Sequence, residues 1–322
     1  MSGETKVNIP ARAVPVPQFI SPGAQAFLTR PATESEPWPE PNDKAGWRAR
    51  VAAIDAAFKE QWAHLGASAP VKVEDRRIDG VRVFDIKPDA WADTNRGVIL
   101  DMHGGGLILC GGELCAMMGA GIAELADARV WAVDYRMPPD HPYPAALDDG
   151  LAVYRALLRE RAPQEIVFHG ASAGGNLIAA LALRARDEGL PLPAAIILQT
   201  PEIDLTESGD SFHTNLGVDP ILGSLMPANI LYANGQDLRH PYLSPLFGDF
   251  SKGFPPALLT TGTRDLYLSN TVRMHRALRA ADIPAELHVT EAGGHGGFPG
   301  TPEGDAINRE IRRFVHAALP SR

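Results

Sequence analysis

The fold is decided at residues 167–176, which read Val167-Phe168-His169-Gly170-Ala171-Ser172-Ala173-Gly174-Gly175-Asn176. An apolar run, 166–168, leads into a serine held between glycines, and an amphipathic run, 177–186, follows at once. This order predicts a strand, a sharp turn and a helix, with the Ser172 hydroxyl exposed at the top of a sheet. Ser172 is therefore a candidate nucleophile. A G-x-S-x-G match also arises by chance, and Ser172 would then be only a helix N-cap.

The composition indicates a globular protein and excludes several partners. The 322 residues suit one α/β body with appended elements, and 45% hydrophobic with 21% charged residues is typical of globular chains. With 30 basic against 39 acidic residues and no basic stripe, nucleic acid is not expected as a partner. No apolar run is long enough to span a membrane, and the N-terminus lacks a signal pattern. We therefore expect a cytoplasmic protein.

The two cysteines, Cys110 and Cys115, are too few for a disulfide framework. No Cys/His pair stands nearby at ligand spacing, so the sequence does not predict a zinc site. Both cysteines are expected to be small buried hydrophobes.

The first part of the chain predicts an arm, a helix and a hairpin. Residues 1–41 are rich in proline, which leaves room only for a short helix near 24–29. A longer helix is expected to begin at Asn42 or Asp43 and to end at Gly66. Its apolar stripe consists of Trp47, Val51, Ile54, Phe58 and Trp62. Two strand-like runs divided by a turn at Asp79-Gly80 then predict an antiparallel hairpin, 71–77 with 81–86.

From residue 97 onward, short apolar strands alternate with helices, which predicts a mostly parallel sheet flanked by helices. The expected strands are 97–101, 130–133, 166–168, 194–199, 257–261 and 286–289. The expected helices are 114–126, 145–159, 176–188, 270–281 and 303–318. Residues 202–253 show no strand pattern, so we interpret them as a lid over the carboxyl edge of the sheet.

A run of three glycines, Gly104, Gly105 and Gly106, follows the strand 97–101 and His103. Such a run leaves backbone N–H groups free to face an oxyanion, although a flexible turn has the same composition. A phosphate cradle is less well supported, because the Lys-[Ser/Thr] of a P-loop is missing. Upstream of a nucleophile elbow, these glycines and the N–H of Ala173 together predict an oxyanion hole.

The chain resembles the hormone-sensitive lipase group of α/β-hydrolases, the bacterial family IV esterases. The resemblance rests on His103 to Gly106, on Gly170 to Asn176, and on Asp134-Tyr135-Arg136-Met137-Pro138-Pro139-Asp140-His141-Pro142-Tyr143-Pro144-Ala145-Ala146. It implies an α/β-hydrolase fold with a helical cap. The expected division is an N-terminal arm and cap helix in 1–66, a catalytic domain in 67–201 and 254–322, and a cap insertion in 202–253.

The resemblance also implies a catalytic histidine at His295. This residue lies in a glycine-rich loop after the last strand, which can carry an imidazole over the sheet edge. His103 is implied to brace the oxyanion loop, and His169 is expected to have a structural role.

The acid should lie between the serine and the histidine in the sequence. Asp265 follows the strand 257–261, where the family has its aspartate, although an ion pair with Arg264 is an alternative role. The other candidates for the acid are Asp204, Asp219 and Glu291, of which Glu291 shares the loop of His295. The order Ser172, Asp265, His295 matches the hydrolases and not the common serine proteases.

These residues predict a serine carboxylesterase that needs no cofactor or metal and acts on short- to medium-chain esters or lactones. Alternatives are an amidase or acyltransferase with the same triad, or a non-catalytic binding protein on the same fold. A homodimer is implied by the resemblance alone. The residues expected to line the substrate pocket are Leu107, Phe212, Leu225, Met226 and Phe298.

Three features depart from the family pattern. Ala171 stands in the elbow where the familiar subgroups have Asp or Thr, so neither subgroup is assigned. Gly297 separates the usual His-Gly from Phe298, and the run after Asp265 is also atypical. None of the three removes a catalytic group.

Overall fold

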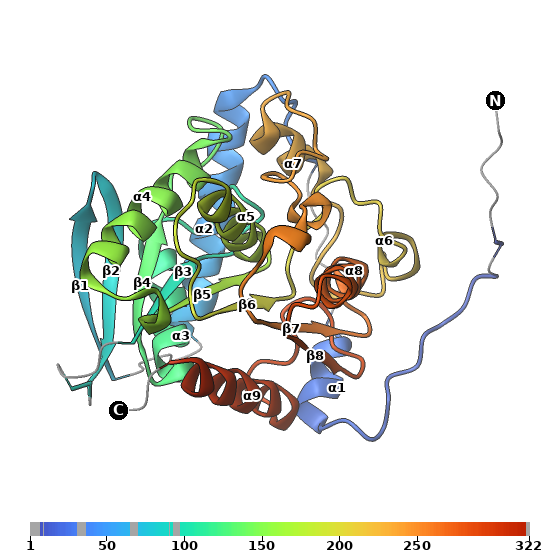
Figure 1. Ribbon diagram of the computed structural model, residues 1–322. Helices are drawn as coiled ribbons and strands as arrows, with labels where there is room; N and C mark the ends of the chain where they lie inside the picture. The colour runs from blue at the N-terminus through green and yellow to red at the C-terminus, as the bar shows by residue number, and fades with distance from the viewer. Residues whose placement is uncertain are drawn as a thin grey trace.

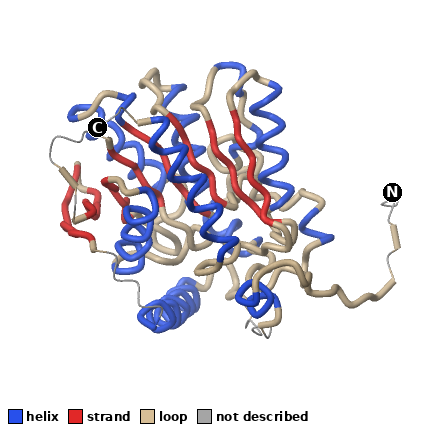
Figure 2. The backbone as a smooth tube through the Cα atoms, turned by 90° about the horizontal axis from the view of Figure 1, so that it is seen from below, coloured by secondary structure: helices blue, strands red, loops and turns tan. Residues whose placement is uncertain are grey.

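The structure, a computed structural model, describes residues 7–8, 10–30, 37–64, 70–89, 91–92 and 97–319. Its centre is an eight-stranded sheet in the order β1-β2-β4-β3-β5-β6-β7-β8 (Figures 1 and 2). The strands are β1 (Val71–Ile78), β2 (Val81–Pro88), β3 (Val98–Met102), β4 (Arg129–Asp134), β5 (Ile166–Ala171), β6 (Ala195–Gln199), β7 (Ala257–Gly262) and β8 (Ala285–Thr290). Only β1–β2 and β2–β4 are antiparallel, so the predicted hairpin and mostly parallel sheet are confirmed.

The main helices are α1 (Pro22–Leu28), α2 (Lys44–His64), α3 (Glu113–Ala126), α4 (Ala145–Glu160), α5 (Ala173–Asp187), α6 (Ser211–Thr214), α7 (Met226–Ala233), α8 (Leu268–Ala280) and α9 (Pro302–Ala318). α5 begins three residues before the predicted start at 176. The reason is that the chain turns into the helix immediately after Ser172, so even the two glycines that follow are helical. The predicted end of the second helix at Gly66 lies outside the described residues.

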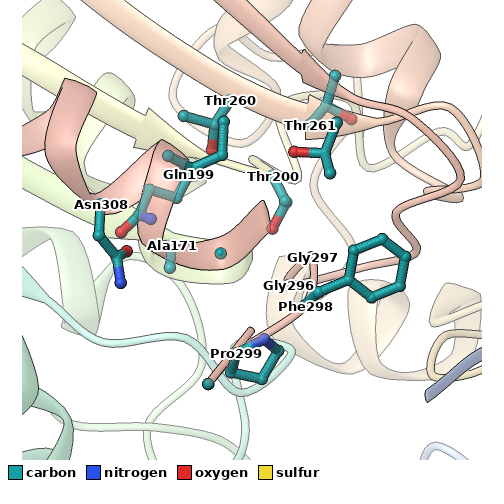
Figure 3. Close-up of a pocket in the computed structure, with 14 residues that line it drawn as sticks. Ala171, Gln199, Thr200, Thr260, Thr261, Gly296, Gly297, Phe298, Pro299 and Asn308 are labelled. Atoms are coloured by element: carbon teal, nitrogen blue, oxygen red, sulfur yellow. The ribbon is translucent and has the colours of Figure 1, made fainter. Parts of the chain in front are cut away.

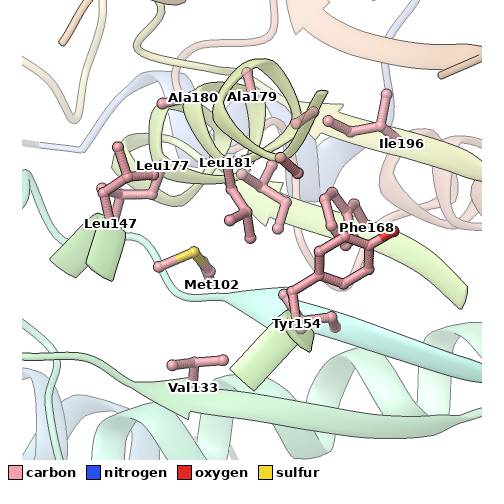
Figure 4. Close-up of a cluster of buried hydrophobic side chains, with 14 of the residues drawn as sticks. Met102, Val133, Leu147, Tyr154, Phe168, Leu177, Ala179, Ala180, Leu181 and Ile196 are labelled. Atoms are coloured by element: carbon pink, nitrogen blue, oxygen red, sulfur yellow. The ribbon is translucent and has the colours of Figure 1, made fainter. Parts of the chain in front are cut away.

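The two faces of the sheet bury different helices, because successive strand residues point to opposite sides. In β3, Leu100 and Met102 pack in one cluster with residues of α4, α5 and α8, whereas Ile99 packs in another with residues of α3 and α9. Figure 4 shows the first cluster, where Met102, Leu147, Phe168 and Leu181 meet. Helices thus cover both faces, and the carboxyl edge of the parallel strands is left for loops.

α2 and the insertion 202–253 share one apolar cluster at that edge. Trp47 of α2 is fully buried there. It packs with Leu109, with Leu114 of α3 and with Ala228 of α7. The other stripe residues of α2 are partly buried against the same cluster. The whole insertion is described and contains α6 and α7 but no strand. We propose that α2 and this insertion form the cap.

α1 is held against the loop that carries His295, although the two lie far apart in the sequence (Figure 1). The ring of Phe27 meets the ring of Phe298 edge-on, with centroids 5.8 Å apart. Ser21, the N-cap of α1, donates from its N–H and its hydroxyl to Glu303 at 2.6 and 2.7 Å. The short helix therefore anchors the residues that follow His295.

We expect Phe27→Ala to detach α1, because removal of a buried phenylalanine side chain from a core costs about 3–5 kcal/mol. Residues 10–30 should be cleaved faster in limited proteolysis, and kcat should fall on the order of tenfold as the His295 loop loosens. Phe19→Ala, on the exposed ring just before α1, is the matched control and should change neither. Unchanged proteolysis of Phe27→Ala would show that α1 is held by other contacts.

Candidate active site

The turn between β5 and α5 holds Ser172 in a strained conformation. Its φ of 56° and ψ of −123° are rare for a residue with a side chain and cost about 1–3 kcal/mol. A Cβ on Gly170 would lie 2.2 Å from the Gly174 carbonyl oxygen, and one on Gly174 would lie 1.9 Å from that of Met102. Only glycine fits at both positions, so the elbow of the sequence pattern is a steric requirement.

Ser172, His295 and Asp265 form a chain of hydrogen-bonding distances. Ser172 Oγ lies 3.0 Å from Nε2 of His295, and Nδ1 of His295 lies 3.2 Å from Oδ1 of Asp265. The Ser172 side chain makes no N-cap hydrogen bond, so this geometry does not support its alternative role as a helix cap. The three side chains come from the carboxyl ends of β5, β7 and β8, where the predicted order places them.

Asp265 is fully buried and fixed by its own neighbours. Thr261 donates its hydroxyl to Oδ2 at 2.8 Å, and the Tyr267 N–H donates to Oδ1 at 2.9 Å. The carboxylate therefore faces His295 with its second oxygen already satisfied. The alternative pairing of Asp265 with Arg264 is not formed, since the Arg264 guanidinium donates to the Pro15 carbonyl.

Among the described residues, the other candidate acids make no hydrogen bond to the His295 imidazole. Asp204 accepts from Thr206, Ser208 and Arg273, and Glu291 is exposed. Asp219 does approach the site, but it binds the backbone and not the imidazole.

The glycine loop faces the elbow from β3. A Cβ on Gly104 would lie 3.4 Å from Cβ of Ser172, so the two backbones are closely packed. Gly105 and Gly106 have φ of 119° and 58°. Among the described residues, no recorded turn or loop hydrogen bond uses the N–H of Gly105, Gly106 or Ala173. We propose that these N–H groups bind the oxyanion.

His103 and His169 are both buried: His103 contacts the backbone of the glycine loop, whereas His169 contacts side chains of neighbouring strands. His103 Nδ1 lies 2.8 Å from the Gly104 carbonyl oxygen, and its ring stacks on Tyr135 at 4.1 Å. Tyr135 in turn donates to the His103 carbonyl at 2.8 Å. His169 is held between Asp101 and Gln199, each at 2.6 Å.

Asp219 is a residue of the site that sequence reasoning considered only as an alternative acid. Its Oδ2 accepts the N–H groups of His295 and Leu266 at 3.1 and 2.8 Å, and its Oδ1 accepts those of Ile221 and Leu222. One buried carboxylate therefore ties the insertion to the loops of both the candidate base and the candidate acid. No sequence pattern could have shown this role, because all the donors are backbone groups.

Glu202 and Tyr267 also lie beside the histidine. The ring of Tyr267 meets that of His295 edge-on at 5.0 Å. Glu202 is fully buried, and burial raises the pKa of its carboxyl to about 7, although the polar side chains of Tyr267 and Asn229 act to lower it. Sequence reasoning missed both residues, since neither belongs to a motif.

Burial of His295 acts to lower the pKa of its imidazole, but the hydrogen bond and charge of Asp265 outweigh burial, with help from Asp219 and Glu202. The net effect raises the pKa above the ordinary value of about 6.5. A general base must be neutral, so activity should be lost as the pH falls through this pKa. We expect the acid limb of kcat/KM to have its midpoint above pH 6.5.

Asp219→Asn should move this acid limb to lower pH, because it removes a negative charge near the imidazole. It should also lower kcat/KM by roughly 10- to 100-fold, since the loss of a charged hydrogen-bond acceptor costs about 1.5–3 kcal/mol. The measurement is a pH profile beside Asp210→Asn, an exposed aspartate of the same insertion, which should match the wild type. An acid limb of Asp219→Asn that coincides with the wild-type limb would contradict this role.

The expected pocket residues fall into different surroundings. Leu225 lies over the oxyanion loop, since a Cβ on Gly106 would be 3.1 Å from its Cδ1, and Met226 follows at the start of α7. Leu107 is buried in the main core, and Phe212 is buried with Leu266 and Tyr267. For these residues a role in substrate binding stays a prediction.

A cavity of about 260 Å³ opens beside the elbow, lined by several threonines and the glycine-rich loop (Figure 3). Ala171 and Phe298 are both part of its wall, but Ser172 and His295 are not. Phe298 is also buried against Phe27, so its place in the ester pocket stays a prediction. Gly296 and Gly297 have φ of 79° and 69°, so the extra glycine of this loop is used for a second left-handed residue.

The comparisons with known proteins agree with this geometry. Residues 99–299 match a family described as the alpha/beta hydrolase fold. The chain belongs to this family. An esterase of Acinetobacter venetianus is 33% identical to this α/β-hydrolase over 223 residues, which are 68% of this chain and 72% of the relative. An acetyl-hydrolase of Streptomyces hygroscopicus is 35% identical over 195 residues, which are 60% of this chain and 64% of the relative.

Solved structures extend the similarity to nearly the whole chain. The crystal structure of esterase E25 has a TM-score of 0.89 and 36% identity, and covers 98% of this chain and 100% of its own. An esterase from the bacterial hormone-sensitive lipase family has a TM-score of 0.78 and 29% identity, and the match covers 93% of this chain and 99% of that one. The resemblance to that group is confirmed. No helix among the described residues is both long and apolar enough to cross a membrane.

Proposed function

We propose that this α/β-hydrolase is a serine carboxylesterase that forms an acyl intermediate on Ser172. The observation that carries the proposal is the continuous contact from Ser172 Oγ through His295 to the buried Asp265, at 3.0 and 3.2 Å. The relatives named esterase and acetyl-hydrolase support the reaction class.

In the proposed reaction, Ser172 Oγ attacks the ester carbonyl while His295 Nε2 takes its proton. Asp265 keeps the proton of His295 on Nδ1 and stabilises the imidazolium. The N–H groups of Gly105, Gly106 and Ala173 bind the oxyanion, with Gly104 as a further candidate donor, and each such donor contributes on the order of 3 kcal/mol. His295 then protonates the leaving alcohol, and water releases the acid by the same steps.

The proposed substrates are short- to medium-chain carboxylic esters or lactones. The Leu225 side chain, from the insertion, lies against Gly106 of the oxyanion loop and would limit the space for a long acyl group. The test is a panel of p-nitrophenyl esters of increasing acyl length together with lactones of different ring size. The expected result is a burst of p-nitrophenol and a maximum of kcat/KM at short to medium acyl length. If the protein turned over none of the activated esters, the proposal would be overturned.

The alternatives predict different products from the same experiment. An acyltransferase would transfer the acyl group to an added alcohol in preference to water, and an amidase would cleave the matching anilide comparably. A binding protein would show no burst. Hydrolysis to the free acid as the main product supports the esterase. Cytoplasmic location and a homodimer stay predictions, and light scattering tests the second.

A further inference from the structure

Three side chains of metal-binding type meet behind the oxyanion loop. The three residues are His103, Cys115 and Asp134. Each offers one ligand atom, a ring nitrogen, the sulfur or a carboxylate oxygen, and these atoms lie within 4.8 Å of one another. They come from the residue after β3, the first turn of α3 and the last residue of β4. This group is separate from Ser172, His295 and Asp265, and the proposed reaction does not use it as a ligand set.

The sheet register brings the three together. Met102 of β3 pairs with Val133 of β4, and Figure 4 shows both side chains on the α5 face of the sheet. The next residues, His103 and Asp134, therefore turn to the opposite face, because the side-chain direction alternates. Cys115 belongs to the cluster on that opposite face, so α3 presents its thiol to the same place.

His103 is prepared as a ligand. The carbonyl of Gly104 can only accept, so Nδ1 of His103, 2.8 Å away, must carry the ring proton. Nε2 then holds a lone pair, and this buried atom has no hydrogen-bond partner among the described residues. A metal-binding histidine typically donates its other N–H to a backbone carbonyl in this way. A buried imidazole nitrogen with a lone pair and no protein donor beside it is suited to coordinate a metal ion.

Asp134 is the third ligand, and it lies on the side from which an ion can reach the site. Its two oxygens already accept from the Gly112 N–H at 2.9 Å and from Arg82 at 3.3 Å, but a carboxylate has about four acceptor sites. Its side chain is 15% exposed and that of Arg82 is 39% exposed, so an ion can enter from this side. A thiolate, a carboxylate and a neutral imidazole together balance a charge of +2.

We propose that His103, Cys115 and Asp134 bind Zn²⁺, with the fourth position open to water. The mixed nitrogen, sulfur and oxygen donors suit this borderline-soft ion. On binding, the Cys115 S–H bond is replaced by a Zn–S bond, and the proton passes to solvent.

Occupation of the site should inhibit the esterase. Zn–S and Zn–N bonds are about 2.3 and 2.0–2.1 Å, so tetrahedral ligand atoms lie about 3.3–3.8 Å apart. The three ligand atoms lie within 4.8 Å of one another, so any pair wider than this tetrahedral spacing must draw together when the ion binds. The shift acts on His103, which is joined directly to the glycine loop, and a displacement of about 1 Å at a reacting centre can cost 10²-fold in rate.

The first test is independent of activity. One equivalent of Co²⁺, a probe for Zn²⁺, should give the thiolate-to-metal charge-transfer band, and Zn²⁺ should abolish it. Cys115→Ser should lose the band and bind Zn²⁺ at least roughly 100-fold more weakly. Cys110→Ser, which removes the other buried cysteine of the same region, should keep the band. Thermal unfolding without metal verifies that both variants fold, and Zn²⁺ should raise the Tm only where the site is intact.

The second test rests on the proposed function. Zn²⁺ should lower kcat in the wild type and Cys110→Ser but not in Cys115→Ser, and a chelator should restore it. A charge-transfer band without any esterase activity would leave the metal site standing and reject the proposed function. Absence of the band in the wild type, its persistence in folded Cys115→Ser, or binding without thiolate character would overturn the site.

Discussion

Ser172→Ala lowers kcat by about 10⁶-fold in our expectation, because the acyl intermediate needs the hydroxyl that lies 3.0 Å from His295. The substitution removes a single oxygen, and alanine keeps the Cβ that packs on Gly104. The strained backbone is imposed by neighbouring glycines and should persist, so the fold is retained. The measurement is the burst of p-nitrophenol from an activated ester, together with mass spectrometry of the acyl-enzyme.

The matched control is Ser251→Ala, which removes an exposed hydroxyl that donates to Asp249. It should keep full activity and the full burst. If Ser172→Ala retained a burst of wild-type size, another residue would have to be the nucleophile and the proposed mechanism would fail.

Asp265→Asn should lower kcat by about 10⁴-fold, the second largest expected effect. An asparagine that turns its amide nitrogen to His295 would favour the wrong tautomer and could not stabilise the imidazolium. Asp265 is fully buried and accepts from Thr261 and Tyr267, so the asparagine oxygen can keep one of these bonds. Stopped-flow kinetics with circular dichroism separate loss of rate from loss of fold.

Glu291→Gln is the control for this assignment, because Glu291 shares the loop of His295 but is exposed. Its kcat should remain within about twofold of the wild type, as is usual for a surface substitution. A severe loss in Glu291→Gln with a mild one in Asp265→Asn would reverse the assignment of the acid.

The sheet and the candidate triad could be predicted because their signals are local. Strands such as β3 and β5 begin with three successive apolar residues, and the turn at Ser172 is forced by Gly170 and Gly174, where any side chain would collide with backbone. Steric requirements of this kind place particular residue types at fixed spacings in the sequence. The choice among Asp204, Asp219, Asp265 and Glu291 was not local, and it depended on which carboxylate the fold brings to Nδ1 of His295.

The sequence by itself determined the fold class, the elbow and the order of serine, acid and histidine, because steric rules and strand periodicity act over a few residues. Only the tertiary structure decided what surrounds them. Phe27 reaches the His295 loop across most of the chain, and Asp219 binds that loop through backbone N–H groups that no pattern records. His103, Cys115 and Asp134 meet only because the register of β3 and β4 and the packing of α3 place them on one face.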